Sequence, residues 1–130
     1  MKILVVDANP LISALIGGKA FDIFYSKKFK LITSEKTIWE VKKYISALAK
    51  KLNEKEDYLF SILEKLPVIT LHPSKYRRKI KVAADIIGNR DIKDVDILAL
   101  TLEINAPLWS QDKDFEGIKE ITLLKTHDLL

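Results

Sequence analysis

The chain has 130 residues, of which 48% are hydrophobic and 31% charged, and its formal net charge is +4. This length predicts one domain, residues 1–130, that buries roughly two-thirds of the surface of the unfolded chain. The absence of cysteine excludes disulfides, thiolate metal ligands and a thiol nucleophile. A mildly basic charge permits a nucleic-acid partner without requiring one.

The compartment is predicted from two further observations. No apolar run reaches the ~18 residues that a membrane span needs. The first residues lead directly into a strand pattern and lack the organisation of a signal peptide. The sequence therefore predicts a cytoplasmic protein. Abundant Lys and Ile, with one Met and one Gln, resemble the composition of thermophile proteins.

The N-terminal third begins with a continuous apolar run over residues 2–6, which predicts a strand buried on both faces of a parallel sheet. A helix is predicted to start at Asn9 and Pro10, because proline at the first helical position loses no hydrogen bond. Gly17 and Gly18 end this helix. A second helix over residues 19–26 and a strand over residues 29–33 follow.

The middle of the chain is predicted to be mainly helical. Ser34 is a suitable N-cap for a helix to about residue 51, along which apolar residues recur every three or four positions. Asn53 and Glu56 resemble a capping box that opens another helix, ending before Pro67. A short strand is expected over residues 68–71.

The last part alternates helices and strands. We expect a helix over residues 74–87, closed by Gly88 and Asn89, and an apolar helix from Asp94 to about residue 103. Residues 107–110 and 121–124 supply two more strands. The sequence thus predicts the α/β class: a three-layer α/β/α sandwich with a central, mainly parallel sheet of about five strands.

Four acidic residues lie where a strand ends or a helix begins: Asp7, Glu40, Asp94 and Asp112. In a parallel α/β sheet these positions line one edge, where ligands bind. Four carboxylates in one cleft repel each other and cost stability unless a cation neutralises them. The pattern predicts a divalent-metal site and phosphodiester chemistry.

Two of these acids also have a structural interpretation. Asp7 suits the N-cap of the following helix. Glu40 lies at the margin of the apolar stripe and, from spacing alone, suits a solvated pair with Lys43. Two polar neighbours would support a site: Asn9 is close enough to orient Asp7, and Ser110 precedes the last acidic turn, where it can bond a carboxylate or a phosphate.

The later acids have structural alternatives as well. Asp91, Asp94 and Asp96 at a helix start favour the helix dipole. Asp112 and Asp114 suit an ordinary polar turn. However, the helix after Asp94 is apolar on almost every side, so its start is expected inside the sheet edge rather than in water.

The donor set indicates which metal would bind. Carboxylate oxygens select Mg²⁺ or Mn²⁺, whereas zinc prefers His and Cys. His72 and His127 are remote from the acids in sequence and are expected on the surface. Bound cations could activate water and neutralise a scissile phosphate, which gives in-line hydrolysis.

A basic stretch offers contacts to nucleic-acid phosphates: Lys75, Arg77, Arg78, Lys79 and Lys81, with Tyr76 inside it and Arg90 beyond. Such contacts give salt-sensitive, sequence-neutral affinity. A solvated helix face is the alternative. Trp39 lies opposite the apolar stripe of its helix, which indicates a dimer or partner surface, or else packing against residues 25–29.

Three segments carry a resemblance to a known family. Residues 5–14 resemble the pattern V-D-[TA]-N-x-L-[IL]-S-A, residues 94–100 resemble D-x-x-x-[IL]-A-[LA], and residues 108–115 resemble [LI]-[VW]-[TS]-x-D-x-D-F. Residues 34–41 match a loosely defined helix with a further acid. In order and spacing the chain resembles the PIN-domain family, a nuclease fold that includes the VapC toxins of toxin–antitoxin pairs.

The resemblance implies four metal-binding acids, an auxiliary acid and a helper serine: Asp7, Glu40, Asp94, Asp112, Asp114 and Ser110. Asp96 is an alternative to Asp94, but Asp94 lies five residues before Ala99, as in the family pattern. The resemblance also implies Mg²⁺ or Mn²⁺, cleavage of single-stranded RNA, commonly a homodimer, and for the toxins a small antitoxin partner.

Parts of this pattern also occur in proteins of other functional classes. A phospho-acceptor domain with Asp7 phosphorylated would need a second acid nearby, and Asn9 stands there instead. The pair Asp94 and Asp96 resembles the acids of topoisomerase–primase metal domains, yet here it opens a helix. A non-catalytic PIN-fold module that binds RNA or protein is the alternative from another class. All four acids are present in this chain. Removing the metal would abolish the activity of a nuclease, whereas a binding module would keep its affinity.

Overall fold

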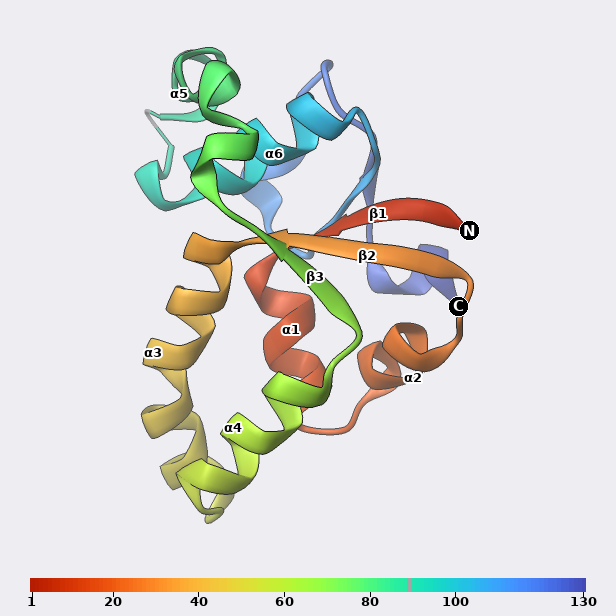
Figure 1. Ribbon diagram of the computed structural model, residues 1–130, viewed down its shortest axis with the longest axis vertical. Helices are drawn as coiled ribbons and strands as arrows, with labels where there is room; N and C mark the ends of the chain where they lie inside the picture. The colour runs from red at the N-terminus through yellow and green to blue at the C-terminus, as the bar shows by residue number, and fades with distance from the viewer. Residues whose placement is uncertain (89) are drawn as a thin grey trace.

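The computed structural model of the protein describes residues 1–88 and 90–130. Within them, five parallel strands form one sheet in the order β3-β2-β1-β4-β5 (Figure 1). The strands are β1 (Lys2–Val6), β2 (Phe29–Ser34), β3 (Val68–Leu71), β4 (Leu108–Trp109) and β5 (Leu123–Leu124). The α-helices are α1 (Ala8–Leu15), α2 (Lys19–Tyr25), α3 (Glu35–Leu52), α4 (Glu56–Lys65), α5 (Ile80–Ile87) and α6 (Val95–Ile104). Short 3₁₀ turns are η1 (Pro73–Lys75), η2 (Arg77–Lys79), η3 (Ile92–Asp94), η4 (Lys113–Phe115) and η5 (Thr126–Leu129).

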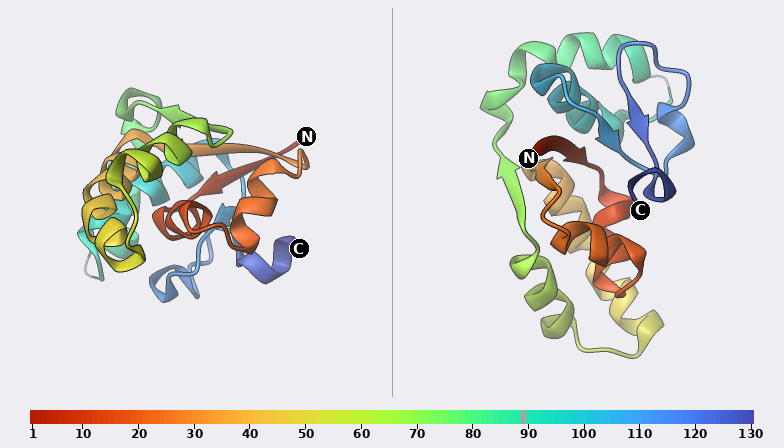
Figure 2. Two further views of the ribbon diagram at one scale, coloured as in Figure 1. Left: turned by 90° about the horizontal axis from the view of Figure 1, so that it is seen from below. Right: turned by 90° about the vertical axis from the view of Figure 1, so that its right-hand side faces the viewer.

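The sheet separates two hydrophobic cores. Leu4 and Val6 of β1 face the core beneath α1–α4, whereas Val5 between them faces the core beneath α5 and α6. This alternation follows from the two-residue period of a strand. Figures 1 and 2 show α1–α4 on one side of the sheet and α5 and α6 on the other. The predicted three-layer sandwich is confirmed, and the sheet is parallel throughout.

The long helix α3 begins as predicted but ends differently. Ser34 caps it, accepting a hydrogen bond from the Thr37 N–H at 3.0 Å. Asn53, expected to open the next helix, instead closes α3 in the left-handed conformation, with φ of 54°. Asparagine tolerates that conformation better than most residues. The N-cap of α4 is Lys55, so the predicted capping box is wrong.

The helix predicted over residues 74–87 is also shorter than expected. Two 3₁₀ turns occupy its first part, and α5 begins only at Ile80. Tyr76 separates the turns with φ of −133°, which is not helical, and its side chain is fully buried. Because the backbone is not helical at Tyr76, the tyrosine ring points into the core beside α6. Gly88 caps the end of α5 as predicted, while Asn89 lies outside the described residues.

No helix among the described residues is both long and apolar enough to cross a membrane. The apolar helix α6 is instead a core element: Ile97, Leu98 and Leu100 are buried against the sheet and α5. Its burial fixes the position of its N-terminus, where the acidic residues lie.

The strand order creates a crevice. From β1 the chain builds outward through β2 and β3, then returns to place β4 and β5 on the other side of β1. The connections on the two sides run over opposite faces of the sheet, so they diverge between β1 and β4. In α/β folds such a switch point, at the carboxyl ends of the strands, is where ligands bind.

Candidate metal centre

Asp7 and Ser110 lie at this switch point, directly after β1 and β4. The Asp7 N–H donates to the Trp109 carbonyl at 3.0 Å, which continues the ladder between the strands. The Ser110 hydroxyl donates to Asp7 Oδ2 at 2.7 Å, and the Ala8 N–H donates to Asp7 Oδ1 at 2.8 Å. Asp7 therefore caps α1 and is also held across the switch point.

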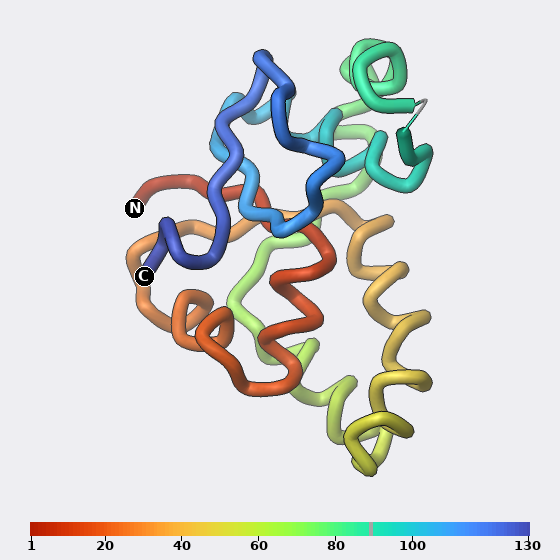
Figure 3. Tube along the Cα trace, turned by 180° about the vertical axis from the view of Figure 1, so that it is seen from behind, coloured from red at the N-terminus to blue at the C-terminus, as the bar shows by residue number. Residues whose placement is uncertain are grey.

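Ser110 organises the loop that follows β4. Its hydroxyl oxygen accepts from the Asp112 N–H at 3.0 Å and from the Asn9 side-chain amide at 3.5 Å. The Asn9 side-chain oxygen accepts from the Gln111 N–H at 3.0 Å. Asn9 thus supports Asp7 through Ser110, not by the direct hydrogen bond that the sequence suggested. Figure 3 shows this loop running past the start of α1.

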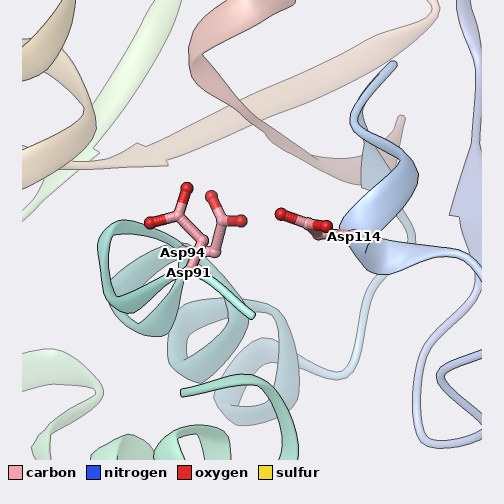
Figure 4. A group of neighbouring side chains, drawn as sticks. All are labelled: Asp91, Asp94 and Asp114. Atoms are coloured by element: carbon pink, nitrogen blue, oxygen red, sulfur yellow. The ribbon is translucent and has the colours of Figure 1, made fainter. Parts of the chain in front are cut away.

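Three carboxylates converge beside this loop. One oxygen atom from each of Asp91, Asp94 and Asp114 lies within 4.8 Å of the others (Figure 4). Asp94 is buried at the start of α6, and Asp114 lies in η4, where its N–H donates to Asp112 Oδ1 at 2.9 Å. Asp91 caps η3 through the Lys93 N–H at 2.9 Å.

Asp91 was not predicted as a ligand. The sequence suggested for it only a favourable interaction with the helix dipole. Its spacing of three residues from Asp94, in a tight turn before a buried helix, is the signal that could have identified it.

Six carboxylates act electrostatically on one another, and the region they share is here called the acidic cleft: Asp7, Glu40, Asp91, Asp94, Asp112 and Asp114. Burial, and then the charges of Asp7 and Asp112, raise the pKa of Asp94 to about 8. Burial also raises the pKa of Asp7, against the lowering effect of its hydrogen bond from Ser110. The pKa of Glu40 is raised by burial first, with a further contribution from Asp7. Each shift has the sign expected of crowded carboxylates without a counter-ion.

The acidic cleft fits a hard divalent cation. Asp94 Oδ2 is buried and has no hydrogen-bond partner. A buried carboxylate oxygen without a partner is costly, and the surrounding charges add to that cost. Oxygen donors at this spacing match the preferences of Mg²⁺ and Mn²⁺. The acidic residues Asp91, Asp94 and Asp114 can hold such an ion.

Comparison with known proteins identifies the family. Residues 5–129 match the sequence profile of the PIN domain. The chain belongs to the PIN-domain family. No curated protein sequence is significantly similar to it.

Solved structures share the fold of this PIN domain. VapBC2 from Rickettsia felis, bound to a DNA fragment of its promoter, aligns with a TM-score of 0.74 and 14% identity, over 95% of this chain and 98% of that one. A toxin–antitoxin complex from Klebsiella pneumoniae gives 0.68 and 20%, over 95% and 97%. VapC20 from Mycobacterium tuberculosis, a toxin that cleaves the sarcin–ricin loop, gives 0.62 and 15%, over 91% and 98%. The expected resemblance to VapC toxins is confirmed for the fold.

Glu40 lies on α3 of this PIN domain and is half-buried. Burial raises its pKa, the charge of Lys36 lowers it, and the charge of Asp7 raises it further. Lys43, its possible surface partner, lies instead over the ring of Trp39, with Nζ 4.3 Å from the ring centroid. The position of Glu40 therefore favours the cleft over a solvated helix face.

Asp96 is directed elsewhere. The Tyr76 hydroxyl donates to Asp96 Oδ2 at 2.6 Å, and Lys36 Nζ lies 3.7 Å from Asp96 Oδ1. Burial and this hydrogen bond raise the pKa of Tyr76. Asp94 is one of the three converging carboxylates, whereas Asp96 is not.

Arg78 of the basic stretch lies away from the acidic cleft, whereas Arg90, beyond the stretch, donates from Nη1 to the Asp114 carbonyl at 2.6 Å. Arg78 binds Glu103 through two hydrogen bonds of 2.6 and 2.8 Å. Glu103 is near the far end of α6, ~13 Å along the helix axis from Asp94 at 1.5 Å per residue. The lysines that act on the cleft are Lys36 and Lys93, whose charges lower the pKa of Glu40.

The remaining surface predictions concern the histidines and Trp39. His72 and His127 are exposed, as expected. Trp39 is 55% exposed and lines a pocket with Pro73, whereas Tyr25 and Phe29 line a different pocket. Its exposure favours a partner surface over packing against residues 25–29.

Proposed function

We propose that this PIN domain is a divalent-metal-dependent ribonuclease that hydrolyses phosphodiester bonds of single-stranded RNA. The observation that supports this most is the unpartnered, buried oxygen of Asp94 among like charges at the switch point of the sheet. A purely structural role would leave such an arrangement without compensation. The match to the PIN-domain profile supports the same chemistry.

In this proposal Asp91, Asp94 and Asp114 hold Mg²⁺ or Mn²⁺ together with Asp7 and Asp112. When bound, such an ion neutralises charge on the scissile phosphate and makes water more acidic. Asp7 keeps its position through the hydroxyl of Ser110, which Asn9 contacts in turn. The chain thus supplies a set of oxygen donors fixed by strand ends and helix starts.

Glu40 is the acid best placed to move a proton. It is half-buried and lies outside the three converging carboxylates, so in this proposal it is not one of the acids that hold the ion. Burial raises its pKa above the ordinary value for glutamate, which makes it a stronger base. We propose that the Glu40 carboxylate, in addition to its contribution to the acidic cleft, accepts a proton from the attacking water.

The decisive experiment is cleavage of a mixed single-stranded RNA with Mn²⁺, Mg²⁺ or EDTA. Wild type is compared with Asp7→Asn and with Asp57→Asn, a control at an exposed acid on α4. We expect metal-dependent cleavage that Asp7→Asn abolishes and Asp57→Asn leaves unchanged. Equal cleavage by all three proteins would reject the site. RNA binding without cleavage in any metal would favour the non-catalytic module.

A protein partner is proposed from the relatives and from the surface. Similar structures include toxin–antitoxin complexes. Exposed Ile16, Leu52 and Tyr58 surround a pocket between α1 and α4, an apolar surface that a partner segment would cover. We therefore propose a small antitoxin, encoded by a short neighbouring reading frame, and a homodimeric toxin. Inhibition of cleavage by the co-expressed neighbour, and the mass of the complex in solution, test both.

A further inference from the structure

Trp39 is an unusual residue on the surface of α3. Its side chain is 55% exposed, although tryptophan is highly buried on average. Lys43 lies over the ring, with Nζ 4.3 Å from the centroid. Trp39 immediately precedes Glu40 on α3. No role in the proposed chemistry accounts for this exposed ring.

The ring forms one wall of a pocket of about 520 Å³. The other lining residues are Glu35, Lys36, Ile38 and Lys42 of α3, Pro73 of η1 and Asp96 of α6. Lys36 is paired with Asp96 in the pocket. The pocket therefore combines an aromatic side chain with two lysines and two carboxylates, and Lys42 is the lysine outside that pair.

Lys36 places the pocket close to Glu40. Its Nζ lies 3.7 Å from Asp96 Oδ1 in the pocket, and Glu40 follows it by one helical turn on α3. A flexible polymer with a phosphate near Glu40 could therefore place an adjacent unit in the pocket.

We propose that this pocket binds one base of single-stranded RNA close to the scissile phosphate. The base stacks on Trp39, and Lys42 contacts a flanking phosphate. Aromatic platforms with neighbouring basic side chains are the usual device for binding single strands, because every base has a π-face. The cores of protein–protein interfaces are depleted in lysine, which argues against a protein occupant. This inference rests on the proposed function, since it assigns a substrate contact to that site.

Tryptophan fluorescence tests the proposal directly. The only other tryptophan, Trp109, is fully buried, so quenching by RNA reports on Trp39. The Asp7→Asn protein in Mg²⁺ is titrated with a short single-stranded RNA, so that the RNA stays intact. We expect quenching, and in parallel a filter-binding affinity that Trp39→Ala lowers about 5- to 100-fold. Trp39→Phe, which keeps a stacking surface, should remain within about threefold of the parent.

Two matched controls separate stacking from general surface effects. Tyr25→Ala removes a comparably exposed aromatic residue on α2 and should leave RNA affinity unchanged. Lys42→Ala should reduce the salt dependence of binding by about one phosphate contact, whereas Lys50→Ala, near the far end of α3, should not. Circular dichroism of each variant verifies that the fold is retained.

The outcomes of these experiments separate the two proposals. If metal-dependent cleavage occurs but Trp39→Ala leaves KM and affinity unchanged, the base pocket is rejected and the ribonuclease stands. If no metal supports cleavage but Trp39→Ala still weakens binding, the pocket stands and the ribonuclease is rejected. A change in oligomeric state of Trp39→Ala, with RNA affinity unaltered, would make this surface a protein interface and overturn the inference.

Discussion

The start of α6 places two carboxylates in opposite environments. Asp94 is 8% exposed and has a buried oxygen without a partner, and neighbouring acids help raise its pKa to about 8. Asp96 receives the Tyr76 hydroxyl at 2.6 Å and lies 3.7 Å from the ammonium group of Lys36. The charge of Asp96 is therefore compensated by Tyr76 and Lys36, whereas that of Asp94 has no such partner among the described residues.

The difference shows how to recognise a ligand among several acids. Residues two apart on a helix point in directions that differ by about 200°. Asp94 therefore faces the acidic cleft, while Asp96 faces Tyr76 on another side of the helix. A carboxylate whose partners all lie in the chain has a structural role, whereas one without a partner among like charges is a candidate cation ligand.

Cleavage activity should show the largest contrast between these acids. We expect Asp94→Asn to lower metal-dependent RNA cleavage at least ~100-fold. The substitution replaces a charged carboxylate with a neutral amide, which is a weaker ligand for a divalent cation. Asp96→Asn keeps an acceptor for Tyr76 and should cost less than ~10-fold. Initial rates in Mn²⁺ measure both. Equal losses in the two variants would remove the distinction between the acids.

The pH dependence of stability should separate them next. The pKa of Asp94 is raised from an ordinary 3.8 to about 8 in the folded, metal-free protein. The folded state therefore binds this proton more tightly than the unfolded state, and the resulting stability is lost as pH rises from 3.8 through about 8.

Thermal unfolding in EDTA between pH 5 and pH 9 measures this effect. Wild type should lose stability towards pH 9, and Asp94→Asn should lose less of it and unfold at a higher temperature at pH 9. Mg²⁺ should stabilise wild type more at pH 8 than at pH 6, because protons compete with the metal. A wild-type curve parallel to that of Asp94→Asn would contradict the shifted pKa.

The smallest expected effect concerns the hydrogen bond between Tyr76 and Asp96. Tyr76→Phe removes the hydroxyl that binds Asp96 while keeping the buried ring, so we expect a loss of about 1–2 kcal/mol in the free energy of unfolding. Tyr44→Phe, at an exposed site on α3, should change it by less than about 0.5 kcal/mol. Urea unfolding compares them. Cleavage at low temperature should persist in Tyr76→Phe.

The sequence alone determined the layers of the fold, and it predicted which acids would lie along one edge of the sheet. The apolar run over residues 2–6 marked β1, because a strand buried on both faces needs a continuous hydrophobic segment, and shorter apolar segments marked the other four strands. The carboxyl ends of parallel strands share one edge, so Asp7 and Asp112 could be expected to meet. Where local preference and tertiary packing agreed, as at the Ser34 cap, the prediction held.

Only the tertiary structure decided which side chains complete the cleft. The bond between Ser110 and Asp7 joins residues 103 positions apart, and no local pattern encodes it. The convergence of Asp91 with Asp114 likewise depends on where η3 and η4 meet. Tyr76 interrupted a predicted helix because burial of its ring outweighed the local helical pattern. Sequence patterns report what each segment prefers by itself, whereas the environment of a charge depends on which distant segments surround it.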